Sequence, residues 1–323
     1  MPHRLATLIL AALALFGCAA PPFATDSSHG ASGSSLSDSL SSGTDVATPP
    51  FFRVESTGGA TLLLLGTIHL GPEEGWQLSP EIEQGLETAD RFAMEIDFRS
   101  LDLDEVGSAL ARRVILPVGT LLDDSISPET AKLISENEAL ITSLGAPEKA
   151  RRRLKPWYLA TNLLQVAIGK TRYALEQSAD NVILNAIGDR PLFGLETFDG
   201  QLGMLDELSP QLQDMMLRDT LGRLDETLAE MDKLIRAWKV GDRAALEIIS
   251  RQGIEEMPEL EAFYDILLTD RNRTWLTPLR AALVDPEQAG STLFVAVGAL
   301  HLVGNDGVPR LLEAAGYKVT TIH

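Results

Sequence analysis

The chain has 323 residues, of which 45% are hydrophobic, 23% charged and 6% aromatic, as in soluble globular proteins rather than disordered chains. Its 27 Lys and Arg against 46 Asp and Glu give a formal net charge of −19. Because so acidic a surface repels phosphate backbones, we expect no nucleic-acid partner. The single cysteine excludes an intramolecular disulfide and a cysteine-rich metal site.

The first 17 residues are typical of a secretory signal, with Arg4 ahead of an apolar run over 5–16. That run is shorter than the roughly 20 residues a membrane-spanning helix needs. Residues 15–18 resemble a bacterial lipobox, which implies cleavage before Cys18 and lipidation of its sulfur. The alternative is an ordinary signal with an incidental cysteine. The lipobox predicts a periplasm-facing lipoprotein of the bacterial cell envelope, and Ala19 favours the outer membrane.

Residues 18–50 are mostly Ser, Gly, Thr, Asp and Ala. This composition has too few apolar side chains to offset the entropy of ordering the chain. We therefore predict a signal peptide over 1–17, a flexible tether over 18–50 and one folded body over 51–323. The lipid anchor is the expected contact with the membrane.

The body begins with a unit of strand, turn, helix and strand. Residues 61–65 are an apolar run typical of a strand buried on both faces, and a Gly-x-x-His turn ending at His69 follows. Ser79 and Pro80 fit the cap and first residue of a helix that runs to Ala89. A second strand is predicted over 91–97.

The middle of the body, from about 101 to 283, is predicted to be a large helical insertion. Helix starts are indicated at Ser127 and Ser209, each followed by Pro, and an amphipathic stripe runs from 212 to 235. A short strand is indicated over 191–197. Pro278 is expected to kink or divide the helical stretch over 263–283.

The end of the body repeats the first unit. An apolar run over 292–297 leads into a Gly-x-x-His turn ending at His301, then a helix from about Pro309 to Gly316 and a strand over 317–322. Strand, crossover helix and strand is the unit of a parallel or mixed sheet. We therefore predict an α/β fold with a mixed sheet built from two repeated units around a helical insertion.

Two of the five histidines, His69 and His301, lie within the expected body away from its ends. Both follow buried strands at their carboxyl ends, where open α/β sheets build ligand sites. If the two units pair across a pseudo-twofold axis, the imidazoles converge. With a carboxylate they can then hold a divalent metal such as zinc, manganese or cobalt. The alternative is that each histidine only braces its own turn.

Glu95, Asp97 and Glu196 are the candidate third ligands, because a carboxylate among apolar residues needs a nearby cation. Strand alternation places Asp97 on the same face, and Glu196 ends another short apolar strand. The alternative for these acids is a helix cap or a buried arginine partner. Arg271 either lies on a solvated helix face or stabilises an oxyanion. Motifs of serine hydrolases, helical zinc proteases and nucleotide-binding loops are absent from the sequence.

These motifs resemble the TraB/GumN group, which is related to the Tiki metalloproteases and, more loosely, to erythromycin-esterase-like and ChaN-like proteins. The resemblance implies a metal-dependent protease with His69, His301 and Glu95 as metal ligands. It also implies a fold like that of the Tiki, erythromycin-esterase-like and ChaN-like proteins. It covers about residues 51–323 and rests on the segments 66–69, 93–97, 155–157, 194–197 with Gln201, Trp238 with 241–242, 271–272 and 297–302 with Gly304.

Our hypothesis is a lipid-anchored hydrolase of peptide bonds whose metal activates water. Glu95 or Glu196 accepts the water's proton, and Arg271 supports the oxyanion. One alternative is a non-catalytic lipoprotein that binds a peptide or haem in the same cleft. Another is a scaffold lipoprotein. The sequence gives no prediction of the oligomeric state.

Overall fold

The computed structural model describes residues 46–255 and 257–323. The predicted signal peptide, Cys18 and the tether up to residue 45 lie outside the described residues. Residues 46–50, which composition assigned to the tether, pack against the body. The Ala47 N–H donates to the Gln77 carbonyl at 2.8 Å, and the Pro50 carbonyl accepts from the Gly66 N–H at 2.8 Å. Backbone hydrogen bonds of this kind do not depend on side-chain composition, so composition could not predict that these residues belong to the body.

The predicted α/β class is confirmed: a mixed sheet of six strands is combined with many helices. The sheet has the order β6-β4-β7-β2-β1-β8. Strands β2, β7, β4 and β6 run parallel to one another, whereas β1 is antiparallel to both β2 and β8. The bounds are β1 Phe51–Glu55, β2 Thr61–Thr67, β4 Arg91–Met94, β6 Leu192–Gly194, β7 Thr292–Gly298 and β8 Lys318–Thr321. A separate antiparallel pair joins β3 (Gly71–Pro72) to β5 (Tyr173–Ala174).

The two central strands, β2 and β7, come from the two predicted units and lie side by side. Their apolar side chains are buried on both faces, as the continuous apolar runs predict. In the parallel register Thr61 pairs with Thr292 and Thr67 pairs with Gly298. Both strands therefore end at the same level, and the two Gly-x-x-His turns leave the sheet together.

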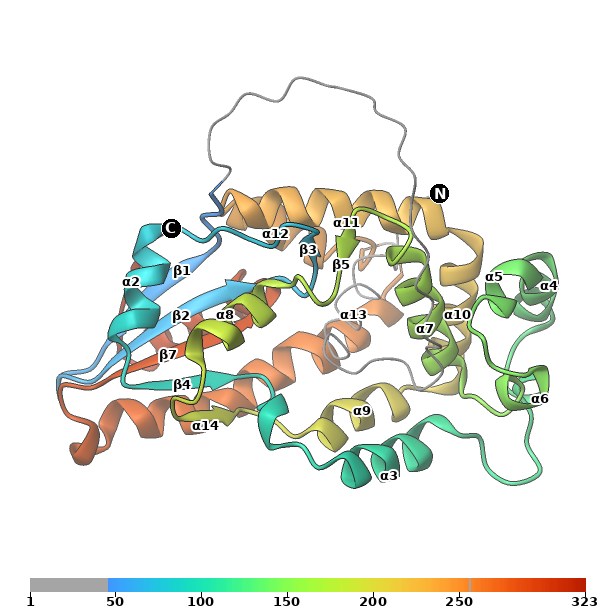
Figure 1. Cartoon of the computed structure of the whole chain (residues 1–323), viewed down its shortest axis with the longest axis horizontal. Coiled ribbons are helices and arrows are strands. Elements are labelled where there is room, and N and C mark those ends of the chain that lie inside the picture. The colour runs from blue at the N-terminus through green and yellow to red at the C-terminus, as the bar shows by residue number, and fades with distance from the viewer. Residues whose placement is uncertain (1–45, 256) are drawn as a thin grey trace, which may run out of the picture.

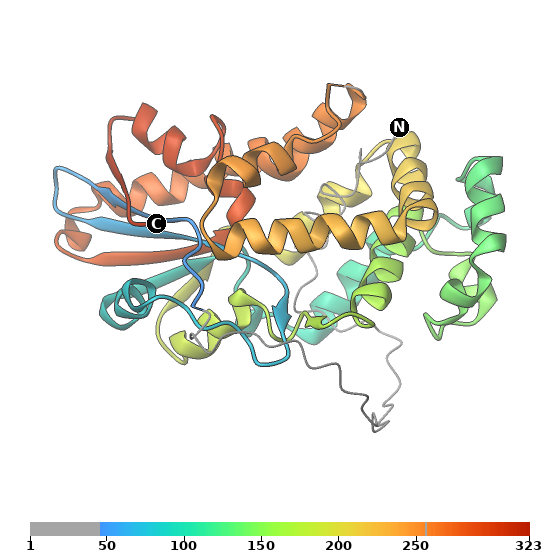
Figure 2. The same cartoon turned by 90° about the horizontal axis from the view of Figure 1, so that it is seen from above.

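Helices cover both faces of the sheet (Figure 2). Helices α2 (Pro80–Thr88) and α8 (Ala179–Ile187) share one apolar core with one face of the sheet, and α14 (Asp270–Val284) and α15 (Val308–Ala314) share another with the opposite face. The path from β2 through α2 to β4 runs across the sheet in the opposite direction to the path from β7 through α15 to β8. Right-handed crossovers that run in opposite directions place their helices on opposite faces.

The helical region lies beyond the carboxyl ends of β2 and β7 and forms the other half of an elongated molecule (Figure 1). Its core includes the buried indoles of Trp157 and Trp238. Among the described helices, none is both long and apolar enough to cross a bilayer. The helices are α3 Leu103–Val114, α4 Pro128–Glu136, α5 Glu138–Thr142, α6 Glu148–Arg151, α7 Pro156–Ile168, α9 Phe198–Asp206, α10 Pro210–Gly222, α11 Leu224–Lys239, α12 Arg243–Ser250 and α13 Glu259–Tyr264.

The predicted starts of three helices are confirmed, since Ser79, Ser127 and Ser209 are the N-cap residues of α2, α4 and α10. Of the two outcomes predicted for Pro278, division of the helix is wrong, because α14 continues through it, and a kink stays a prediction. Proline inside a helix costs about 3 kcal/mol. Burial of Leu279 and Leu283 against the sheet stabilises this helix by about 1.5–3 kcal/mol each and offsets that cost.

Candidate active site

The two Gly-x-x-His turns pack closely where β2 and β7 end. A Cβ atom at residue 66 would lie 3.0 Å from the Ala299 Cα atom, so glycine is needed for this approach. His69 lies in the loop after β2, and His301 lies in the short 3-10 turn Ala299–Leu302 that follows β7. The predicted convergence of the two histidines on one region is therefore present.

Glu95 is the buried anion of this region. The residue follows β4, the neighbour of β7, so its carboxylate reaches the end of β7. Glu95 Oε1 accepts a hydrogen bond from the Gly298 N–H at 2.8 Å, and Oε2 accepts from Gln201 Nε2 at 3.2 Å and Arg271 Nη2 at 2.5 Å. Burial alone would raise the Glu95 pKa, but the Arg271 charge, the two histidines and the Gly298 N–H bond together outweigh burial and hold the pKa at about 2.

Arg271 is the buried cation. It follows the π-helical turn Asp265–Thr269, which joins α13 to α14, and such turns frequently occur at functional sites. Besides its bond to Glu95, Arg271 donates from Nε to Glu196 Oε1 at 2.8 Å and from Nη1 to the Leu267 carbonyl at 3.0 Å. Burial raises the pKa of Glu196, and the Arg271 charge only partly opposes that rise.

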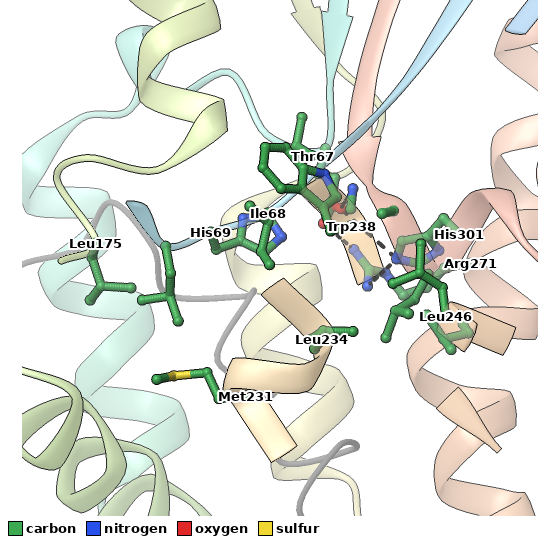
Figure 3. Close-up of a pocket in the computed structure, with 16 residues that line it drawn as sticks. Thr67, Ile68, His69, Leu175, Met231, Leu234, Trp238, Leu246, Arg271 and His301 are labelled. Atoms are coloured by element: carbon green, nitrogen blue, oxygen red, sulfur yellow. Dashed lines mark hydrogen bonds and ion pairs between the residues drawn. The ribbon is translucent and has the colours of Figure 1, made fainter. Parts of the chain in front are cut away.

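His301 is held as a neutral imidazole. Asn272 Nδ2 donates to the Asp306 carbonyl at 2.8 Å, which turns the amide oxygen of Asn272 toward His301 Nδ1 at 2.6 Å. Because an amide oxygen only accepts, we assign the proton to Nδ1, and Nε2 accepts from Arg271 Nη1 at 3.0 Å (Figure 3). Burial and the neighbouring Arg271 charge hold the His301 pKa well below its usual range.

His69 has a different set of partners. Its Nδ1 lies 2.9 Å from Asp180 Oδ2, and Thr67 Oγ1 donates to Asp180 Oδ1 at 2.8 Å. Burial opposes the charged imidazole, but the Asp180 carboxylate outweighs burial and raises the His69 pKa. His69 Nε2 is a buried atom with no hydrogen-bond partner among the described residues. Asp180 Oδ2, although it lies 2.9 Å from Nδ1, is likewise without a hydrogen bond among the described residues, so His69 Nε2 is one free basic atom of the site.

Gly298 is where these groups meet. A Cβ atom placed on Gly298 would lie 3.2 Å from Glu95 Oε1, 3.3 Å from His69 Nε2 and 3.6 Å from His301 Cδ2. The groups from the two turns and from the end of β4 therefore surround one backbone position. The absence of a side chain there leaves them room.

A cavity of about 700 Å³, counting its open mouth, adjoins this cluster (Figure 3). The cluster residues His69, Glu95, Arg271 and His301 border it, and the rest of its lining is almost entirely apolar. A smaller cavity shares His69 and Glu95 with the first and includes Ser178, Asp180, Asn181 and Gln201 among its other lining residues.

All five predicted site residues of the body are brought together: His69, Glu95, Glu196, Arg271 and His301. A solvated face is wrong for Arg271, which is buried. The expectation that Asp97 shares the face of Glu95 is also wrong, because β4 ends at Met94 and the Asp97 carboxylate bonds instead to Arg99.

The sequence analysis missed Asp180 and gave no role to Asn272. Asp180 is buried in the first turn of α8, two residues after that helix's cap residue Ser178. An acid in a first helical turn usually indicates only a favourable helix dipole, so local sequence did not distinguish it. Asn272 adjoins Arg271 in the segment 271–272, which is among those that carry the family resemblance, and this was the signal available in the sequence.

The cluster suits the predicted metal ion only in part. The chemistry of His69, His301 and Glu95 suits zinc, manganese or cobalt, and an oxygen acceptor faces each Nδ1, as is usual for metal-binding histidines. However, Arg271 donates to His301 Nε2 and to Glu95 Oε2. Within residues 46–255 and 257–323, no group of three or more His, Cys, Asp or Glu has an arrangement that could hold a metal. In this arrangement the cluster does not fit a three-ligand centre.

Comparison with known proteins agrees with the motif assignment. A model of the TraB/PrgY/gumN family matches residues 50–321. The chain belongs to this family. It is 25% identical over 271 residues to the uncharacterized protein YbaP of Escherichia coli K12 and of Shigella flexneri, covering 82% of this chain and 92% of either relative.

Another similar protein is an uncharacterized protein of Treponema pallidum, 25% identical over 207 residues, which are 62% of this chain and 60% of the relative. No solved structure matches this TraB/PrgY/gumN member. The resemblance to the TraB/GumN group is thus confirmed. The cluster of buried charges described above lies inside the matched region of this chain.

Proposed function

We propose that this TraB/PrgY/gumN member is a peptide hydrolase whose active site is the cavity beside His69. The observation that carries the proposal is the His69–Asp180 pair. The carboxylate faces Nδ1, and Nε2 remains buried without a partner among the described residues. A carboxylate-oriented imidazole with a free nitrogen is the arrangement of a general base.

In this proposal, neutral His69 accepts a proton from the attacking water at Nε2 and later gives it to the leaving amine. Glu95, with its pKa of about 2, remains ionised and stabilises the imidazolium that forms. Arg271 uses four of its five N–H groups on Glu95, Glu196, Leu267 and His301. Its remaining N–H, on Nη2, is available for the developing oxyanion.

The two cavities that share His69 and Glu95 in their lining support an amide substrate. In this proposal the scissile carbonyl lies beside these two residues, and each cavity takes the substituent on one side of it. Of the two acids first considered as bases, Glu95 is poorly suited because its pKa is so low. Glu196, whose pKa is raised, is the better second proton acceptor.

The metal-dependent form of this hydrolase stays a prediction. Zinc, manganese or cobalt held by His69, His301 and Glu95 would require Arg271 to release its bond to His301 Nε2. A metal-dependent Tiki-like protease predicts stoichiometric metal in the purified full chain and loss of that metal in His69→Ala and His301→Ala. Metal content measured by mass spectrometry decides between the two forms.

We also propose that the chain is attached to the outer membrane of the bacterial envelope by a lipid on Cys18. Its substrates would then be periplasmic peptides or proteins. The two strand, turn, helix and strand units are proposed to be repeats related by a pseudo-twofold axis. The parallel pairing of β2 and β7 and the helices on opposite faces support that relationship.

The experiment is a digest of a mixed peptide library by the purified full chain, read by mass spectrometry. We expect cleavage by the wild type, loss of at least 100-fold of the rate in His69→Ala, and retained activity in His323→Ala. His323 is the matched control because it lies outside the cavity. Equal rates in wild type and His69→Ala would overturn the proposal.

The second candidate function is a non-catalytic module that binds a peptide or haem. The apolar lining of the cavity favours it, since such a lining can hold a ligand without chemistry. It predicts saturable peptide binding without products, or a haem Soret band that disappears in His69→Ala. The same library and an absorption spectrum of the haem-loaded chain distinguish these outcomes.

A further inference from the structure

We infer that the substrate places a neutral aliphatic side chain, of leucine or methionine size, in the larger cavity beside the bond that is cleaved. This inference rests on the proposed function and names its substrate class. It follows from the walls of the cavity, from the charges that border it and from the position of His69.

The walls of the cavity are aliphatic. Helix α11 contributes Met231 and Leu234, α12 contributes Leu246, and the π-helical turn contributes Leu268. Leu175 lines the cavity from the loop after β5 (Figure 3). Because burial of apolar area provides about 25 cal/mol per Å², an aliphatic group gains free energy on entering such a space.

One wall is rigid and limits the size of the occupant. Trp238 is buried, its Nε1 donates to the Gly66 carbonyl at 2.8 Å, and its ring centroid lies 4.8 Å from that of Trp76. A side chain held at both its polar atom and its ring does not move aside. The fixed indole therefore favours an occupant of moderate size over a bulky aromatic one.

Outside the cluster of His69, Glu95, Arg271 and His301, the lining of the cavity has no charged side chain to pair with a charged occupant. Within the cluster, the charges of Glu95 and Arg271 already bond to each other. Burial of an unpaired charge costs several kcal/mol, so Lys, Arg, Asp or Glu in this position is disfavoured.

The cavity also reaches the proposed base, because His69 lines it. An aliphatic side chain inside it therefore lies next to the carbonyl that His69 Nε2 serves. The preference consequently belongs to a residue that adjoins the scissile bond rather than to a remote subsite.

Binding of small amides to the purified full chain tests this inference independently of cleavage. The probes are 4-methylpentanamide, a neutral leucine-like amide, and succinamate, a charged amide of similar length. Binding is followed by ligand-detected NMR. We expect 4-methylpentanamide to bind at least tenfold more tightly than succinamate, and Leu234→Glu to weaken it at least tenfold.

Leu228→Glu is the matched control, since Leu228 is half-buried on the same helix but does not line the cavity. Its affinity for 4-methylpentanamide is expected to equal that of the wild type. Absence of binding, equal affinity for both amides, or no effect of Leu234→Glu would each overturn the inference. A library digest without cleavage would instead overturn the proposed hydrolase, so the two failures are distinguishable.

Discussion

At the scale of single residues, the site contains two kinds of group. Some are charges that pair with one another, and one is a basic ring nitrogen without a hydrogen-bond partner among the described residues. Glu95, Arg271 and Glu196 form a buried network in which each charge has an opposite partner. Such a network by itself indicates only that removal of one partner costs about 3–5 kcal/mol. His69 differs because Nδ1 is held while Nε2 lacks a partner among the described residues.

Gly298→Ala tests the crowding of this site. The backbone of Gly298, with φ −50° and ψ 135°, is open to alanine, so the change adds a methyl group without backbone strain. That methyl group would lie 3.3 Å from His69 Nε2 and 3.2 Å from Glu95 Oε1. We expect hydrolysis to fall at least tenfold in the library digest.

The matched control is Gly290→Ala, where an added Cβ meets no atom within 4 Å. Gly290 has a φ of 80°, so this control loses some stability but leaves the site intact. Unchanged hydrolysis in Gly298→Ala would contradict the proposed geometry of His69 and Glu95.

Asp180→Asn tests the role of Asp180 as a positioning residue for His69. Loss of the carboxylate removes the charge that raises the His69 pKa and permits the wrong tautomer. We expect a fall in rate of at least 100-fold. The residual activity, which rises with pH as His69 loses its proton, should shift its rise to lower pH.

A full pH–rate profile of Asp180→Asn makes this measurement, because a merely structural role would not move the profile. Asp189→Asn is the control, since Asp189 is an exposed acid just beyond the end of the same helix. A profile identical to that of the wild type would remove Asp180 from the mechanism.

At the scale of elements, two consecutive residues at the start of α14 serve the site, directly after the π-helical turn Asp265–Thr269. On a regular helix, neighbours project about 100° apart. Here Arg271 reaches Glu95 and Glu196, while Asn272 reaches His301 Nδ1 from the next position. The Arg271 Nη1 bond to the Leu267 carbonyl ties the side chain to this turn.

Helix α11 is attached to the end of β2 by the bond from Trp238 Nε1 to the Gly66 carbonyl. Trp238→Phe removes this donor in a buried environment, where an unsatisfied carbonyl costs about 1–3 kcal/mol. We expect urea unfolding to report a loss of stability in that range. Trp76→Phe, which removes the donor to the Leu70 carbonyl, provides a comparison at a more exposed indole. Equal stability of Trp238→Phe and wild type would show that the bond does not attach the helix.

At the scale of the whole molecule, Glu95 links stability to pH. Its folded pKa of about 2 is below the ordinary value of 4.5, so its ionised form stabilises the native state. This contribution is fully present above pH 4.5 and is lost as the pH falls toward 2. We expect the unfolding free energy of the wild type to fall more steeply over this range than that of Glu95→Gln.

Urea unfolding at successive pH values makes the comparison, and the other carboxylates, present in both proteins, cancel in the difference. Parallel pH dependence in the two proteins would mean that Glu95 lacks the charged partner described here.

Much of the fold was predictable because it depends on local patterns. Continuous apolar runs predicted β2 and β7, and Ser-Pro pairs predicted three helix starts. The duplicated turns also predicted that His69 and His301 serve one region, since parallel strands end at the same edge. The end of β4 and the path of α14 through Pro278 were not predicted, because tertiary packing decides both.

The sequence by itself determined the family, the α/β class and the five polar residues that meet in the body, because motifs and periodicity are local properties of a chain. Only the tertiary structure decided how those residues pair. Arg271 lies 176 positions from Glu95, and Asp180 lies 113 positions from Thr67. The choice between a metal and an arginine as the cation beside Glu95 depends on such distant contacts, which no local pattern encodes.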